Sequence, residues 1–237
     1  MKDLIDGIDP SWKINLELLK SDYRDFLLKD HGYIPKKEHI FNAFKTLKMN
    51  DVKYVLFGQD PYPRAKSASG YAFIDGNVKS IFDKRGTLSA DVNRATSLRN
   101  FIKMTLLARE DLSKDDLSPH AIIALDKSDY INDIWQLKDN FEKNGVLLLN
   151  TSLVFTDKKS CSFHARAWES FIIDAIDKLD HQKVKLILFG SFAKSLYDNN
   201  KSLQKYDAFV CEHPYNISFI TNNDVLDFFR PMDLLSV

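Results

Sequence analysis

The chain has 237 residues, 44% hydrophobic and 28% charged, so it can bury a sizeable core and has the composition of a globular protein. Its 33 basic residues balance 33 acidic ones, which excludes an overall attraction to nucleic acid and restricts any contact with DNA to a local site. The two cysteines, Cys161 and Cys211, are too few for a disulfide framework or a thiolate zinc site.

The sequence gives no indication of a membrane segment. Residues 1–6 lack the apolar core of a secretory leader, and no apolar run approaches the roughly 20 residues of a membrane span. We therefore expect a cytoplasmic protein that makes no membrane contact.

The N-terminal part predicts two amphipathic helices. Residues 11–29 place apolar side chains at three- and four-residue spacing after Pro10, and residues 36–48 repeat this pattern after Pro35. The second helix would lead into a short apolar strand over residues 54–57.

Helices and short apolar strands alternate along the rest of the chain. A helix is expected from Leu98, capped by Thr96 or Ser97, and residues 111–133 look like an irregular surface insertion broken by Pro119. The later elements are expected in this order: a helix over 135–144, a strand over 146–149, a helix over 168–179, a strand over 184–189, a helix from 193 to 197 and a strand over 208–210.

This alternation predicts the α/β class, a three-layer α/β/α fold with a central, mostly parallel four-stranded sheet. No linker or repeat divides the chain, so residues 1–237 are expected to form a single domain. Because ligands bind beyond the carboxyl ends of parallel strands, the loops carrying Asp60, Asn150 and His213 should meet at one site.

The residue types alone leave alternatives open at this site. Asp60 follows a buried strand in a loop stiffened by two prolines, as a catalytic carboxylate would, but an aspartate before proline also caps turns. A lone histidine before proline, such as His213, is more often a satisfied loop residue. An asparagine that ends a strand, such as Asn150, is more often a turn residue.

Several motifs, taken in order, resemble family 1 uracil-DNA glycosylases. They are GQDPY (58–62), GYAF (70–73), LLLN (147–150) and HP (213–214), with supporting segments IFNAF (40–44), ATSL (95–98), HARAWE (164–169), LFGSFA (188–193) and RPMDLL (230–235). The combination covers most of the chain from about residue 34, and it is specific in a way that no single motif is.

The resemblance implies an enzyme that flips uracil out of DNA and hydrolyses its N-glycosidic bond, the first step of base-excision repair. Asp60 would stabilise the positive sugar and position water, and His213, as a neutral imidazole, would donate to the uracil oxygen. Asn150 would pair with the edge of uracil, and Phe73 would stack on it, unless Phe73 is a core aromatic. Tyr62 would exclude the methyl group of thymine, and Gln59 would line the pocket through its backbone.

DNA contacts are carried over in the same way. Ser97, Ser191 and Ser218 match hydroxyl residues that hold phosphates, and Ile217 matches an apolar wedge that enters the base stack. For Ile217 the alternative of plain core packing is equally open.

The sequence departs from the family pattern around these motifs. Pro63 replaces a histidine, and the stretch 64–69 adds Arg64 and Lys66, which could contact phosphate. Tyr215 and Asn216 replace a rigid proline and a phosphate-binding serine, and residues 219–223 replace a basic step. These changes predict retained catalysis with an altered grip on DNA.

The favoured function is therefore uracil-DNA glycosylase activity on uracil-containing DNA, with no metal and no cofactor in the reaction. The resemblance further implies a monomer and leaves room for a proteinaceous inhibitor as a partner. The alternatives are a glycosylase-fold DNA-binding or replication accessory protein with weak or no catalysis, and a glycosylase of broadened base choice. A phosphate-transfer enzyme is disfavoured, since the chain has no phosphate-binding P-loop motif.

Overall fold

The computed structural model describes residues 4–29 and 31–237, so Met1–Asp3 of the N-terminal segment considered above lie outside the described residues. Contacts divide the chain into two compact units. The sheet unit comprises Met1–Asp75, Gly145–Leu188 and Phe192–Val210, and the helical unit comprises Gly76–Asn144, Phe189–Ser191 and Cys211–Val237. The single domain over residues 1–237 stays a prediction.

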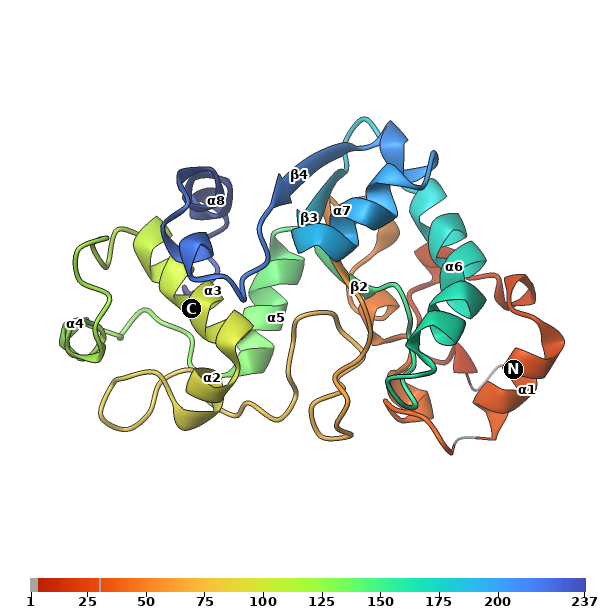
Figure 1. Ribbon diagram of the computed structural model, residues 1–237, viewed down its shortest axis with the longest axis horizontal. Helices are drawn as coiled ribbons and strands as arrows, with labels where there is room; N and C mark the ends of the chain where they lie inside the picture. Colours follow the sequence, from red (N-terminus) through yellow and green to blue (C-terminus); the bar gives the residue numbers. More distant parts are fainter. Residues whose placement is uncertain (1–3, 30) are drawn as a thin grey trace. The chain divides into compact units, whose positions relative to one another are not determined.

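The sheet has four strands, as predicted. They are β1 (Tyr54–Gly58), β2 (Val146–Asn150), β3 (Lys185–Phe189) and β4 (Asp207–Cys211), in the spatial order β2-β1-β3-β4 (Figure 1). β1 pairs in parallel with both β2 and β3, and Gly58 is the register partner of Asn150. β2 is buried along its whole length, and β1 and β3 are buried except at end residues, which explains why these strands read as continuous apolar runs in the sequence.

The predicted N-terminal helices are wrong in extent. Over residues 11–29 only α1 (Ser21–Leu28) is an α-helix, preceded by short 3₁₀ turns at Pro10–Trp12 and Leu16–Leu18. Residues 36–48 hold 3₁₀ turns at Lys37–His39 and Asn42–Phe44, and a further turn follows at Met49–Asp51. The spacing of apolar residues predicted burial correctly, since Phe41 and Phe44 are buried. It did not distinguish an α-helix from 3₁₀ turns, because both place apolar residues three or four positions apart.

The other helices of the sheet unit follow β2 and β3. α6 (Cys161–Asp177) begins seven residues before the predicted start at Trp168, and α7 (Gly190–Asp198) continues directly from β3 into a turn at Leu203–Lys205. α1 lies beside α6 (Figure 1), and Tyr23 of α1 bonds through its hydroxyl to Nδ1 of His164 on α6, at 2.7 Å. This buried contact ties the N-terminal segment to α6.

The helical unit is built around α3 (Thr96–Ala108). The ring of Phe101 on α3 lies against the rings of Phe141, Phe219 and Phe229, with centroids 5.2 to 6.2 Å apart. The remaining elements of this unit are α2 (Ala90–Arg94), α4 (Pro119–Ala124), α5 (Ile134–Lys143), α8 (Asn223–Phe229) and the 3₁₀ turns Ile217–Thr221 and Arg230–Met232.

Two further predictions in this unit need correction. The residue that caps α3 is Ala95, and Thr96 and Ser97 lie inside the first turn with no side-chain capping bond. Residues 111–133 are not irregular throughout, since Pro119 begins α4 and Ser118 caps it. Proline fits the first turn of a helix because its missing N–H has no partner there in any case.

Among residues 4–29 and 31–237, no helix combines the length and the apolar character needed to cross a membrane.

Candidate active site

The ends of β1 and β2 approach each other very closely. A Cβ atom on Gly58 would collide with Oδ1 of Asn150 and would lie 2.9 Å from the Cβ of Ala72. Glycine is therefore required at position 58, because any side chain there would displace the Asn150 amide. The sequence pattern GQD is explained by this close approach.

The Asn150 side chain is almost fully buried, with 4% of its surface exposed. Within the described part of the chain, its amide group makes no hydrogen bond. Among the described residues, the fully buried side-chain polar atoms without a partner are Ser67 Oγ and Trp168 Nε1, so the amide atoms of Asn150 keep a small accessible surface. An amide that has no protein partner, remains accessible and offers both donors and an acceptor can bind a ligand that supplies the complementary groups.

The loops that follow β1 and β2 are tied together at this edge. The Thr151 amide donates to the carbonyl of Gly58, at 2.9 Å, and the carbonyl of Gln59 accepts from the Thr151 hydroxyl (2.9 Å) and from the Ser152 amide (3.1 Å). The Gln59 side chain is exposed, so its backbone is the structured part of this residue. These bonds hold Asp60 and Asn150 on the same edge of the sheet.

Asp60 is half-buried in this loop. Burial raises the pKa of its carboxyl group above the ordinary value, and the neighbouring Cys161 thiol acts in the opposite direction. That thiol donates to the carbonyl oxygen of Asp157, at 3.6 Å. No hydrogen bond from a described backbone amide reaches the carboxylate, so the turn-capping alternative finds no support. Cys161, at the start of α6, was not singled out by the sequence, where it is one isolated cysteine.

Tyr62 and Phe73 are joined on the same unit. The Tyr62 hydroxyl donates to the carbonyl oxygen of Phe73, at 3.3 Å, and burial raises the pKa of Tyr62, which keeps the hydroxyl protonated. Phe73 has a φ of 67°, a left-handed conformation that is strained for an aromatic residue. Its side chain is partly exposed, so Phe73 is not a fully buried core residue, and its stacking role stays a prediction. The strained backbone and the Tyr62 hydrogen bond together fix where the ring of Phe73 stands.

His213 belongs to the helical unit and has a defined tautomer. Its Nδ1 accepts a hydrogen bond from the backbone amide of Tyr215, at 3.0 Å, so the ring proton of the neutral form lies on Nε2. Partial burial lowers the pKa of His213, which favours this neutral form. The ring therefore presents an N–H donor at Nε2.

Asn100 holds the His213 loop and was missed in the sequence. Its side-chain nitrogen donates to the carbonyl oxygen of Pro214 at 2.8 Å and lies within 3.5 Å of the carbonyls of Tyr215 and Asn216. Asn100 is 2% exposed and lies among the buried apolar residues of α3. In the sequence, Asn100 could have been found as a polar residue on an otherwise apolar helix face.

The residues matched to phosphate contacts lie at helix starts and turns of the helical unit. Ser97 is half-buried in the first turn of α3, Ser191 is exposed at the start of α7, and the Ser218 hydroxyl donates to the carboxylate of Glu212. Ile217 is 79% exposed, so the core-packing alternative is wrong. Its role as a wedge stays a prediction.

The predicted site residues thus form two sets. Gln59, Asp60, Tyr62, Phe73 and Asn150 belong to the sheet unit, and Ser97, Ser191, His213, Ile217 and Ser218 belong to the helical unit. In the ranges that the structure describes, no group of three or more His, Cys, Asp or Glu side chains could hold a metal ion.

Comparison with known proteins places this site in a family. The model of the uracil DNA glycosylase superfamily matches residues 44–232. A crystal structure of wild-type UNG from Nitratifractor salsuginis is 45% identical, with a TM-score of 0.95, and the match covers 99% of this chain and 96% of that one. The uracil-DNA glycosylase of Francisella philomiragia is 29% identical over 225 residues, 93% of this chain and 85% of that protein.

A more distant likeness concerns the fold alone. A mimivirus UNG variant solved in complex with UGI is 21% identical, with a TM-score of 0.50, and the match covers 86% of this chain and 74% of that one.

The fold is that of a DNA glycosylase, and the predicted three-layer α/β/α architecture is confirmed by the Nitratifractor structure. The chain belongs to the uracil DNA glycosylase superfamily.

The raised pKa of Asp60 predicts an effect on stability. Because the folded state holds this proton more tightly than the unfolded chain, ionised Asp60 disfavours folding at pH 7, and the penalty disappears as the pH falls through the folded pKa. Asp60→Asn should therefore unfold at the same or a higher temperature than the wild type at pH 7, and the difference should shrink towards pH 4.

Asp157 is the matched control, because its substitution should change the unfolding temperature in the opposite direction. Hydrogen bonds from Ser160 and the Lys159 amide hold the pKa of Asp157 below its ordinary value, so its contribution is present at pH 7 and is lost in acid. Asp157→Asn should lower the unfolding temperature at pH 7. A similar loss with Asp60→Asn, measured by calorimetry, would contradict the account of Asp60.

Proposed function

We propose that this chain is a uracil-DNA glycosylase, which binds uracil flipped out of DNA and hydrolyses its N-glycosidic bond to initiate base-excision repair. Membership of the superfamily supports this activity. The observation that carries it is the amide of Asn150, accessible and without a protein partner, on the same sheet edge as the half-buried carboxylate of Asp60.

Asp60 acts on the sugar. When the bond to uracil breaks, the deoxyribose approaches an oxocarbenium ion, and a nearby carboxylate stabilises the developing positive charge and orients the attacking water. Partial burial supports this role, because electrostatic interactions are stronger where water is excluded.

His213 acts on the leaving base. Uracil departs as an anion, and its oxygen needs a hydrogen-bond donor that strengthens as the charge develops. The bond from the Tyr215 amide to Nδ1 leaves the proton on Nε2, which serves as that donor without a positive charge on the ring. Asn100 is a positioning residue here, since it holds the backbone that follows His213.

Base recognition rests on three side chains of the sheet unit. Asn150 pairs with the edge of uracil, and its donors and acceptor distinguish uracil from cytosine. Phe73 stacks on the base. Tyr62, fixed by its bond to the carbonyl of Phe73, occupies the space of the thymine methyl group, and Gln59 lines the pocket with its backbone.

The grip on DNA differs from the family pattern. Ile217 enters the base stack as a wedge, which its exposure supports, and Ile217→Ala should slow excision from duplex DNA more than from single strands.

Ser97 and Ser191 contact phosphates. Ser218 contributes less, because its hydroxyl is bonded to the Glu212 carboxylate. Arg64 lies 3.4 Å from the buried carboxylate of Asp75, which limits its use as a phosphate contact.

The expectations about the cellular setting remain proposals: a cytoplasmic monomer that makes no membrane contact. The mimivirus protein solved with UGI supports testing a proteinaceous inhibitor against this chain. An accessory protein without catalysis is not favoured, because the chain belongs to the uracil DNA glycosylase superfamily and closely matches the structure of a UNG.

Uracil release tests the proposed function. A single-stranded oligonucleotide with one uracil should yield an abasic site, cut by alkali, with EDTA present throughout. Asp60→Asn should lower kcat by a factor of about 100 or more while DNA affinity changes little, since the carboxylate acts mainly in the transition state.

Asp180→Asn serves as a control, because Asp180 is an exposed turn aspartate that pairs with Lys183. It should keep the wild-type rate. No product from folded wild-type protein would overturn the proposed function, and equal losses of kcat and of binding in Asp60→Asn would assign Asp60 a structural role.

Thymine exclusion by Tyr62 can be tested separately. Tyr62→Ala opens space at the thymine methyl position, so the variant should release thymine from a thymine-containing oligonucleotide that the wild type leaves intact. Tyr62→Phe keeps the ring and should still exclude thymine. If Tyr62→Ala and the wild type show the same selectivity, Tyr62 does not exclude the methyl group.

A further inference from the structure

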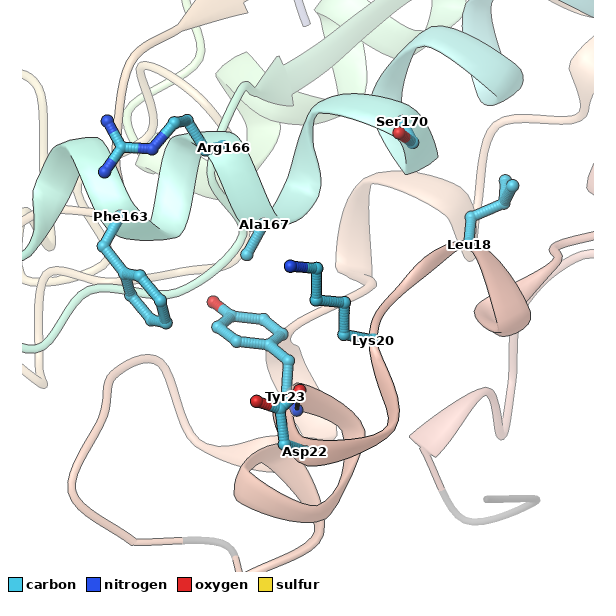
Figure 2. Close-up of a pocket in the computed structure, with 8 residues that line it drawn as sticks. All are labelled: Leu18, Lys20, Asp22, Tyr23, Phe163, Arg166, Ala167 and Ser170. Carbon is cyan, nitrogen blue, oxygen red and sulfur yellow. Dashed lines mark hydrogen bonds between the residues drawn. The ribbon is translucent and has the colours of Figure 1, made fainter.

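A groove separates the N-terminal segment from α6 in the sheet unit (Figure 2). Two neighbouring cavities, of about 350 and 340 Å³, share Asp22, Tyr23 and Phe163 as lining residues. Lys20 and Arg166 line the first cavity, on its opposite walls. We call this feature the α1–α6 groove.

The groove carries positive charge without matching partners. Lys20 and Arg166 are exposed, and in the part of the chain that the structure covers neither side chain makes a hydrogen bond or an ion pair. Asp22 also lines both cavities and keeps its negative charge while it accepts from the Tyr23 amide, so the two cations and one carboxylate of the lining leave a net charge of +1. The two unpaired cations favour an anionic ligand.

An aromatic ring stands beside these cations. Phe163 is 55% exposed, and its centroid lies 5.8 Å from that of Tyr23, edge to face. The Tyr23 ring is itself fixed, because its hydroxyl bonds to His164. A phenyl ring held on one side and open on the other is suited to stacking with a nucleic-acid base.

The groove begins beside the candidate active site. α6 starts at Cys161, whose thiol is a neighbour of the Asp60 carboxylate, and Ser160 lines the second cavity. Arg166 follows Cys161 by five residues, about 7.5 Å along a helix axis. Its side chain extends back towards the start of α6 (Figure 2), as side chains on a helix tend to do. A strand engaged at Asp60 therefore reaches the groove within a short length.

We propose that the α1–α6 groove binds the DNA strand that carries the uracil, on one side of the flipped nucleotide. Lys20 and Arg166 contact phosphates, and Phe163 stacks on an unpaired base. An acidic peptide would use the cations but would gain nothing specific from the open face of Phe163. This inference rests on the proposed function, and it supplies a grip on DNA where residues 215–223 lack the family's basic and hydroxyl contacts.

Salt-dependent binding tests the groove. The probe is a fluorescein-labelled, uracil-containing single strand with flanks on both sides, measured by anisotropy in an Asp60→Asn background that prevents turnover. For single-stranded DNA, the slope of log K against log salt concentration becomes less steep by about 0.7 for each phosphate contact removed. Lys20→Ala/Arg166→Ala should therefore flatten the slope by about 1.4, and Lys20→Arg/Arg166→Lys should restore it.

Phe163→Ala should weaken binding by about fivefold or more without changing the salt slope, because stacking involves no counterion release. Phe163→Tyr should bind as the parent does. Removing the flank on one side of the uracil should abolish the effect of all the groove substitutions, and removing the other flank should leave it intact.

Lys29→Ala/Lys201→Ala is the matched control, since both lysines are exposed and belong to the sheet unit. An equal change of slope in this control, or no change in the groove variant, would overturn the inference. The proposed function is tested independently by measuring uracil release by the wild type and the groove variants. The substrate is an oligonucleotide that keeps only the flank on which the groove substitutions act. If the wild type releases uracil and the groove variants bind as it does, the groove inference alone fails.

Discussion

The close approach of Gly58 to the Asn150 side chain is the constraint on which the rest of the site depends. The two residues are register partners at the ends of adjacent parallel strands, and the absence of a side chain on Gly58 leaves room for a buried amide. The same strand ends fix the backbone of Gln59 and thereby the start of the Asp60 loop. Carboxylate and amide are thus positioned by main-chain hydrogen bonds before any ligand arrives, which is the preorganisation that a catalytic site requires.

The His213 loop is organised by a similar principle with different parts. A buried side chain on α3, Asn100, satisfies the carbonyl of Pro214, and the Tyr215 amide fixes the tautomer of the imidazole. For the proposed catalytic His213, the tautomer is therefore set by a neighbour on its own loop. Cys161 is a neighbour of Asp60 and begins α6, so it lies between the Asp60 loop and the α1–α6 groove.

Much of the fold could be predicted from the sequence because buried parallel strands produce continuous apolar runs. All four strands were located within about a residue at each end. The N-terminal helices were overestimated, because 3₁₀ turns at Leu16–Leu18 and Asn42–Phe44 also bury apolar residues every three or four positions. α4 was missed because Pro119 was interpreted as breaking a helix, whereas it begins one. The two cases look alike in the sequence, and the capping hydrogen bond of Ser118 distinguishes them in the structure.

In the site, too, some residues could be identified from sequence motifs, while other contacts are visible only in the folded chain. Asp60, Tyr62, Asn150 and His213 could be named from motifs, while the pairing of Asn100 with a distant loop depends on a separation of 114 residues that no local pattern encodes. Ile217 was undecided because an isoleucine suits a core and a wedge equally, and only its exposure in the folded chain excludes the core.

The most direct measurement of the central claim is a titration of the ¹⁵N-labelled protein with free uracil, in which the side-chain amide signals of Asn150 are followed by NMR. The account predicts a saturable shift of these signals with uracil and none with thymine, because the unpaired amide receives its partner only when the base fits beside Tyr62. Unchanged Asn150 signals, or equal shifts with both bases, would contradict it.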